Sequence, residues 1–343
     1  MASVKGLATG VGSLPHKDAE SALDLIFKYL PEAPFWPQLP KRDIRESMVA
    51  QFSEHLPCLK VTDEGLLFDE KSIDTELEKF YERVIAQDDD YFNISSAFSN
   101  GFHGFYERLK KENTAEIQML KCQITGPFTF SAGINNSKGL AILHDEVFMQ
   151  AMVKGLAMKA LWQINILKEF NKKILMFVDE PYLGCFGSAY TAVNKEQVIR
   201  TLEELCSSLK SGGILTGVHC CANTDWSIFT QVSSLDIISF DAFGFLDRLI
   251  LYAQDLAGFF KRGGILCWGI VPTQEFDSRV SRDSLIDRIQ KGVQTLIKKG
   301  LDKDLIWNNL MLSPSCGLGT LDTAKSEKIF SLLQEISAYM RKA

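Results

Sequence analysis

The feature that most constrains the fold is a repeated order of short apolar strand, polar turn and amphipathic helix along the 343 residues. Strands that alternate with helices predict βα units around a parallel sheet. Eight segments have strand character: Gly6–Val11, Phe35–Leu39, Met119–Ile124, Ile174–Val178, Ile214–His219, Asp236–Phe240, Ile265–Ile270 and Leu310–Ser313. Eight parallel strands are the number that closes a (β/α)8 barrel, so we predict one TIM-barrel domain over residues 1–343.

Helical periodicity fills most of the intervals between these strands. The predicted helices are Ala19–Tyr29, Ile44–His55, Phe148–Phe170, Lys195–Lys210, Leu246–Arg262, Arg282–Lys299 and Thr323–Arg341. The span from Lys41 to Glu116 is too long for a single crossover. We therefore expect an insertion between the second and third strands, with a hairpin around Thr62–Asp69 and two further helices.

Composition narrows the class of protein. The net charge of -6 and the absence of a Lys/Arg run argue against a nucleic-acid partner. No apolar run approaches membrane-spanning length, and the first six residues do not resemble a signal peptide. Eight cysteines in such a chain indicate reduced thiols and a cytoplasmic location.

Small, polar and metal-capable residues follow most of the predicted strands. These stretches are Gly10–His16, Thr125–Thr129, Asp179–Pro181, His219–Cys221, Asp241–Phe243, Gly269–Thr273 and Ser315–Gly319. In a barrel the carboxyl ends of all strands face one mouth, where catalytic groups lie. The pattern therefore predicts one active site built from several strand ends.

A metal site is predicted at the end of the fifth strand. His219 and Cys221 are two residues apart, so their side chains share one face of the strand while Cys220 points to the other. Cys316 and Asp241 end two other strands, and one imidazole, two thiolates and a carboxylate suit zinc with an exchangeable position. Zinc deprotonates an incoming thiol, and the thiolate is a good nucleophile towards a methyl donor.

The alternative for any cysteine is a buried, inert side chain. We assign that role to Cys58, Cys122, Cys185, Cys206, Cys220 and Cys267. A lone His-x-Cys pair is a weak pattern, so the same alternative stays open for His219 and Cys221.

Candidate substrate-binding groups lie at two other strand ends. Only one of Asp179 and Glu180 can face the barrel axis, and we assign Asp179 as the carboxylate that binds a substrate ammonium. A helix cap is the alternative role for this pair. Gly12 and Ser13 offer backbone N–H groups and a hydroxyl to a substrate carboxylate, although the same residues also suit an ordinary turn.

In order along the chain, these motifs resemble those of cobalamin-independent methionine synthase. The motifs are Gly12-Ser13-x-Pro15, Met48–Leu56, Thr125-Gly126-Pro127-x-Thr129, Asp179-Glu180-Pro181, His219-x-Cys221, Asp241 and Cys316-Gly317-Leu318. The similarity is to the C-terminal catalytic barrel of that family and spans nearly the whole chain. Residues 219–224 also resemble the zinc motif of methylcobalamin-dependent thiol methyltransferases in the related uroporphyrinogen decarboxylase superfamily.

The resemblance implies zinc on His219, Cys221 and Cys316, and it puts Asp241 where the synthase has a glutamate ligand. Aspartate is one methylene shorter, which leaves its bond to zinc open. The resemblance also implies that an amino-acid thiol such as homocysteine is bound by Gly12, Ser13 and Asp179. We assign Asp179 as the catalytic carboxylate.

Three positions depart from the family. Arg42 stands where the synthase has a glutamate for the substrate amine, residues 130–134 lack the tryptophan of the folate loop, and residues 271–274 lack the histidine acid. Two of the three losses concern the folate donor, and a methylcorrinoid needs no such acid because its leaving group is already good. We therefore expect methylcobalamin or a corrinoid protein as methyl donor.

The predicted function is a zinc-dependent S-methyltransferase that acts on a small-molecule thiol, with homocysteine the first choice and methionine the product. One alternative is a decarboxylase of the uroporphyrinogen type, which would need basic residues at the strand ends. Apart from Lys41 and Arg42, the sequence has no arginine cluster at the predicted strand ends. The other alternative is a non-catalytic zinc-binding or corrinoid-binding protein.

Overall fold

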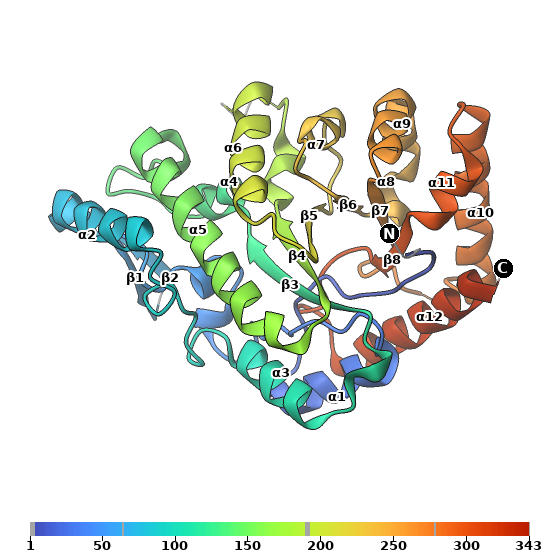
Figure 1. The fold of residues 1–343 in the computed structure, drawn as a ribbon, viewed down its shortest axis with the longest axis horizontal. Coiled ribbons are helices and arrows are strands. Elements are labelled where there is room, and N and C mark those ends of the chain that lie inside the picture. Colours follow the sequence, from blue (N-terminus) through green and yellow to red (C-terminus); the bar gives the residue numbers. More distant parts are fainter. Residues whose placement is uncertain (1–3, 64, 189–192, 278, 343) are drawn as a thin grey trace.

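A curled, six-stranded parallel sheet forms the centre of the computed structural model, which describes residues 4–63, 65–188, 193–277 and 279–342. The strands lie side by side in chain order: β3 (Met119–Thr125), β4 (Lys173–Asp179), β5 (Ile214–Cys220), β6 (Ile237–Phe240), β7 (Ile265–Val271) and β8 (Leu310–Pro314). Figure 1 shows the sheet as an arc with helices along its outer side. The predicted α/β class and these six strands are confirmed, while the ends of the predicted domain, residues 1–3 and 343, lie outside the described residues.

The first two predicted strands are wrong as regular strands. Residues 6–11 and 35–39 make only isolated bridges, of which one joins Ala8 to Leu312 in β8 and another joins Phe35 to Lys121 in β3. Proline has no N–H and cannot donate to a strand ladder. The second segment contains Pro37 and is flanked by Pro34 and Pro40, so it lacks backbone donors that a strand ladder needs.

These two segments still lie between β8 and β3, the two edge strands of the sheet. Thr9 N donates to Leu312 O at 3.0 Å, and Lys121 N donates to Pro34 O at 2.9 Å. A third bridge, between Ser13 and Gln38, links the two segments to each other. Full closure of an eight-membered barrel remains a prediction.

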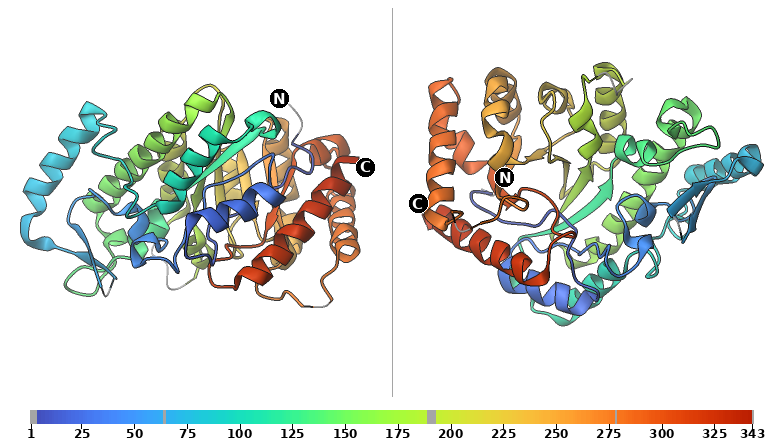
Figure 2. Two further views of the ribbon diagram at one scale, coloured as in Figure 1. Left: turned by 90° about the horizontal axis from the view of Figure 1, so that it is seen from below. Right: turned by 180° about the vertical axis from the view of Figure 1, so that it is seen from behind.

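The α-helices of the described residues lie along the outer side of the sheet and in the segment before β3. They are α1 (Ala19–Tyr29), α2 (Ile73–Ala86), α3 (Asn100–Lys111), α4 (Pro127–Ala132), α5 (Glu146–Leu167), α6 (Lys195–Ser208), α7 (Ser227–Gln231), α8 (Ala242–Leu249), α9 (Ala253–Lys261), α10 (Arg282–Lys298), α11 (Lys303–Asn308) and α12 (Thr323–Lys342). Figure 2 shows that α1 and α12 lie side by side, so the first and last helices meet. No helix within the described residues has both the length and the apolar composition to cross a bilayer.

The insertion before β3 contains the predicted hairpin, formed by β1 (Leu59–Thr62) and β2 (Gly65–Phe68), and two helices, α2 and α3. The predicted helix Ile44–His55 is wrong, because only two short 3-10 turns form there. The backbone is extended at Ser47, with ψ of 157°. The buried Gln51 bonds the Gln38 side chain at 2.8 Å and Phe98 O at 2.9 Å, so tertiary contacts override the helical pattern.

The predicted helix Leu246–Arg262 is also corrected, since it is divided into α8 and α9 by a 3-10 turn at Ile250–Tyr252. Both pieces keep apolar residues buried.

Alternate residues of the strands face the inside of the arc. Near the amino ends these inward residues form an apolar cluster that includes Met119, Leu175, Ile237, Ile265 and Met311. Strand side chains alternate with a period of two, so the inward face reaches its last residues at the carboxyl ends. The apolar cluster forms a floor, and the polar residues of the strand ends lie above it.

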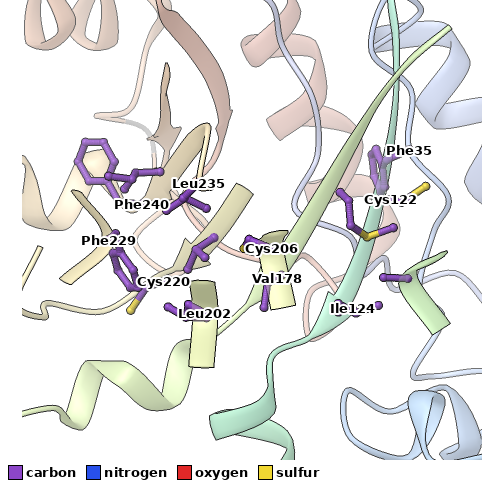
Figure 3. Packing of buried hydrophobic residues seen from close by; sticks show 14 of the residues in the cluster. Phe35, Cys122, Ile124, Val178, Leu202, Cys206, Cys220, Phe229, Leu235 and Phe240 are labelled. Carbon is purple, nitrogen blue, oxygen red and sulfur yellow. The ribbon is translucent and has the colours of Figure 1, made fainter. Parts of the chain in front are cut away.

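The main core lies between the sheet and the outer helices. Figure 3 shows Cys220 within it, near Phe229 and Phe240, and Cys122 near Ile124. Cys58, Cys122, Cys206, Cys220 and Cys267 are buried as predicted, whereas Cys185 is exposed.

Candidate active site

Three metal-capable side chains meet at the carboxyl ends of β5 and β8. His219 is the penultimate residue of β5, Cys221 follows that strand directly, and Cys316 lies two residues beyond β8. Their candidate ligand atoms, one from each side chain, all lie within 4.8 Å of one another. The structure thus brings together the imidazole and two thiols that the sequence predicted as a metal site.

The histidine ring is oriented for a ligand. Its Nδ1 lies 2.9 Å from Ser239 Oγ, while Nε2 is buried with no hydrogen-bond partner among the described residues. A buried polar nitrogen without a partner is costly. With its proton on Nδ1, the ring would present the Nε2 lone pair to a metal ion, and a donor set of one imidazole and two thiolates fits zinc.

The two thiols of Cys221 and Cys316 lie close together at the strand ends. The proximity of Cys221 and of His219 lowers the pKa of the Cys316 thiol. The proximity of Cys316, together with burial, raises the pKa of the Cys221 thiol. The pair therefore favours one thiolate, on Cys316, which is the form that binds a metal.

Asp241 lies outside this cluster of three. It is the N-cap of α8, where its Oδ1 accepts a hydrogen bond from Gly244 N at 2.7 Å. The predicted role of Asp241 as a fourth ligand stays a prediction.

A cavity of about 580 Å³ opens above the three ligands. Asp179 and Ser13 lie in its wall, and Met48, Thr273, Leu321 and Lys41 also line it. Ser13 Oγ accepts a hydrogen bond from Gly319 N at 3.2 Å, which leaves its proton free to donate into the cavity. Gly12 does not line the cavity; its carbonyl accepts a hydrogen bond from Gln38 N.

Asp179 and Glu180 face opposite ways at the end of β4. Asp179 lines the cavity, and burial raises the pKa of its carboxyl to about 6 although the charge of Lys121 lowers it. Glu180 is fully buried behind the strand, where Oε1 accepts from Phe128 N at 3.0 Å and Oε2 from Thr129 N at 2.8 Å. Glu180 thus holds the first turn of α4, and Asp179 is the carboxylate at the cavity.

A second cavity, of about 630 Å³, adjoins the first. Cys221 and Cys316 line both cavities, and Asp241, Phe243 and Arg288 line the second one. The two thiols therefore border both cavities.

Two residues at the site were missed by the sequence reasoning. Ser239 orients His219 from the neighbouring strand β6, a contact that becomes visible only when the strands are placed in register. Lys121 lies inside the arc beneath Asp179. Its charge within the apolar stretch Met119–Ile124 was a signal that could have identified it.

Arg42 does not line the first cavity; it pairs with the buried Glu46, with Nη1 and Oε1 2.5 Å apart. Lys41 is the only lysine or arginine among the described residues that line this cavity. A pocket for several substrate carboxylates would need more basic groups, so the described residues give no support to the decarboxylase alternative.

The comparison with solved structures agrees with the fold. A B12-independent methionine synthase from Shewanella sp. W3-18-1, solved in complex with selenomethionine, superposes with a TM-score of 0.58 at 17% identity and covers 98% of both chains. This chain has the fold of that methionine synthase. A putative B12-independent methionine synthase from Listeria monocytogenes gives a TM-score of 0.43 at 15% identity, over 68% of this chain and 69% of that one. No protein-family profile and no curated protein matches the sequence.

Proposed function

We propose that the protein is a zinc-dependent S-methyltransferase that methylates homocysteine to methionine. The observation that carries the proposal is His219 Nε2, which has no hydrogen-bond partner among the described residues and lies beside two thiols in a cavity with a carboxylate in its wall. His219, Cys221 and Cys316 would hold zinc, which when bound lowers the pKa of a substrate thiol so that a thiolate is available at neutral pH.

The remaining residues of the cavity bind and orient the amino-acid part of the substrate. Asp179 accepts hydrogen bonds from the substrate ammonium, and the Ser13 hydroxyl donates one to its carboxylate. The substrate thiolate then attacks the methyl carbon of a donor, and the bond from that methyl group to the donor breaks with its electron pair left on the donor. Positioning of the two reactants supplies much of the rate.

The second cavity gives a methyl donor access to the same two cysteines. The expected corrinoid donor gains no support from the comparisons, since both methionine synthase neighbours are described as B12-independent. The lack of a tryptophan in residues 130–134 and of a histidine in residues 271–274 argues in the other direction. These observations favour different methyl donors, so an assay with each donor is needed to distinguish a folate from a corrinoid.

The test is methionine formation from homocysteine by the zinc-loaded protein, with methyltetrahydrofolate and methylcobalamin in parallel reactions. We expect methionine with one of the two donors and none after a zinc chelator is added. Absence of methionine with both donors, in protein shown to contain zinc, would leave a non-catalytic zinc protein as the better account.

We further propose that the chain is one barrel domain in which residues 6–13 and 35–39 replace the first two strands. The bridges from Ala8 to β8 and from Phe35 to β3, with the link between Ser13 and Gln38, support this closure.

A further inference from the structure

A lysine is buried inside the arc, directly below the candidate active site. Lys121, on β3, is 1% exposed, and its side chain lies between two rings, with Nζ 5.9 Å from the centroid of Phe35 and 5.2 Å from that of Phe177. Burying an ammonium group costs a great deal unless its hydrogen bonds and charge are compensated. The buried ammonium group of Lys121 therefore requires compensating interactions, because its desolvation costs much free energy.

Two of its three N–H groups have hydrogen-bond partners among the residues that the structure describes. Lys121 Nζ donates to Val11 O and, at 2.8 Å, to Gln123 Oε1. Both acceptors are neutral, so they satisfy hydrogen bonds without balancing the positive charge. The third N–H and the charge need another partner.

A small cavity next to the ammonium supplies the place for that partner. It has a volume of about 10 Å³ and is lined by Lys121, Asp179, His219, Ser239 and Ser313 among others. Two buried oxygens in this lining, Asp179 Oδ1 and Ser313 Oγ, have no hydrogen-bond partner within the described part of the chain. A volume of this size holds about one water molecule, and a buried water needs two to four polar partners.

We propose that Lys121 is a positioning residue, which holds the Asp179 carboxylate in place for the substrate ammonium through one ordered water in this cavity. The water accepts a hydrogen bond from Lys121 Nζ and donates to Asp179 Oδ1 and Ser313 Oγ. The carboxylate is thus fixed from below by a cation, while its other side faces the substrate cavity. This inference rests on the proposed function for its substrate, and on the structure alone for the geometry.

The binding test compares homocysteine with 4-mercaptobutanoate, which is homocysteine without the amine. Lys121→Met in the zinc-loaded protein should weaken homocysteine binding on the order of 10-fold, the effect of one lost charge-assisted hydrogen bond. Binding of 4-mercaptobutanoate should stay within about 2-fold, because that thiol does not use Asp179. Calorimetric titration of both thiols measures the difference, and equal losses for the two thiols would overturn the proposal.

Lys159→Met is the matched control. Lys159, on α5, is also fully buried and also donates to a backbone carbonyl, Asn93 O at 3.2 Å, but it lines neither cavity of the site. The Lys159→Met variant should be less stable than the wild type, but the ratio of its affinities for homocysteine and 4-mercaptobutanoate should not change. A change in that ratio as large as that of Lys121→Met would show a general effect of removing a buried charge, and would contradict the inference.

Crystal structures of the wild type and of Lys121→Met test the positioning role of Lys121 independently of the proposed substrate. Wild-type crystals should show one water within hydrogen-bond distance of Lys121 Nζ and Asp179 Oδ1, and Lys121→Met should reorient or disorder the Asp179 side chain while His219 keeps its position. An unchanged Asp179, or a dry cavity in the wild type, overturns the inference even if homocysteine is methylated. If both features are seen but homocysteine does not bind, the proposed substrate is wrong and the positioning role of Lys121 stands.

Discussion

Replacing Cys316 with serine is expected to remove the metal and the activity together. Cys316 is one of three candidate ligands, and its thiol is the one whose pKa the surroundings lower. Loss of an outer-shell partner of a metal site already costs about 10–100-fold in affinity. Loss of a ligand should cost more, so zinc measured after dialysis should fall from about one per chain, as a single site implies, to near zero.

Two further variants should show an intermediate loss of zinc affinity and no loss, respectively. Ser239→Ala removes the partner of His219 Nδ1 and should weaken zinc binding by about 10–100-fold without abolishing it. Cys220→Ala removes a thiol that is adjacent in sequence but packed in the core on the other face of the strand, and should leave the zinc content unchanged. If Cys220→Ala loses as much zinc as Cys316→Ser while both remain folded, the assigned ligands are wrong.

The second large effect is expected from Asp179→Asn. The change removes the negative charge that faces the first cavity while keeping the size of the side chain. A hydrogen bond to a charged group contributes about 1.5–3 kcal/mol, which corresponds to roughly 10–150-fold in affinity. We expect KM for homocysteine to rise by that factor, with zinc content unchanged and with little effect on the use of 4-mercaptobutanoate.

The pH dependence provides an internal check on this variant. Burial raises the pKa of Asp179 to about 6, so the carboxyl loses its charge as the pH falls through 6. The preference for homocysteine over the des-amino thiol, taken as the ratio of their kcat/KM values, should therefore decline below pH 6 in the wild type. Taking the ratio cancels the ionisation of the thiol, which both substrates share. In Asp179→Asn the ratio should be low and constant with pH, and a wild-type decline that persists in the variant would show that another group binds the amine.

Much of the site could be predicted because it depends on local rules. The period of two along a strand puts His219 at the inner face and Cys220 in the outer core, and it separates Asp179 from Glu180 in the same way. The parallel order of the strands brings Cys316, almost a hundred residues further along the chain, to the same edge as His219. These relations need only strand boundaries and the direction of the chain.

What could not be predicted depends on tertiary contacts. The apolar residues of 35–39 suggest a strand, but the prolines around them remove the donors that a ladder needs. Residues 44–55 have a helical pattern, but the hydrogen bonds of the buried Gln51 side chain favour an irregular conformation there. The need for glycine at position 101 also depends on a tertiary contact. A Cβ there would lie 1.8 Å from Pro37 O, and this close approach exists only in the folded chain.

X-ray absorption at the zinc edge, with selenohomocysteine as the ligand, is the most direct test of thiol activation at this site. Before addition, the zinc should have two sulfur neighbours, from Cys221 and Cys316, and nitrogen from His219. After addition a zinc–selenium distance should appear, and Cys221→Ser should lose it. A zinc spectrum without a selenium neighbour at saturating selenohomocysteine would contradict the account.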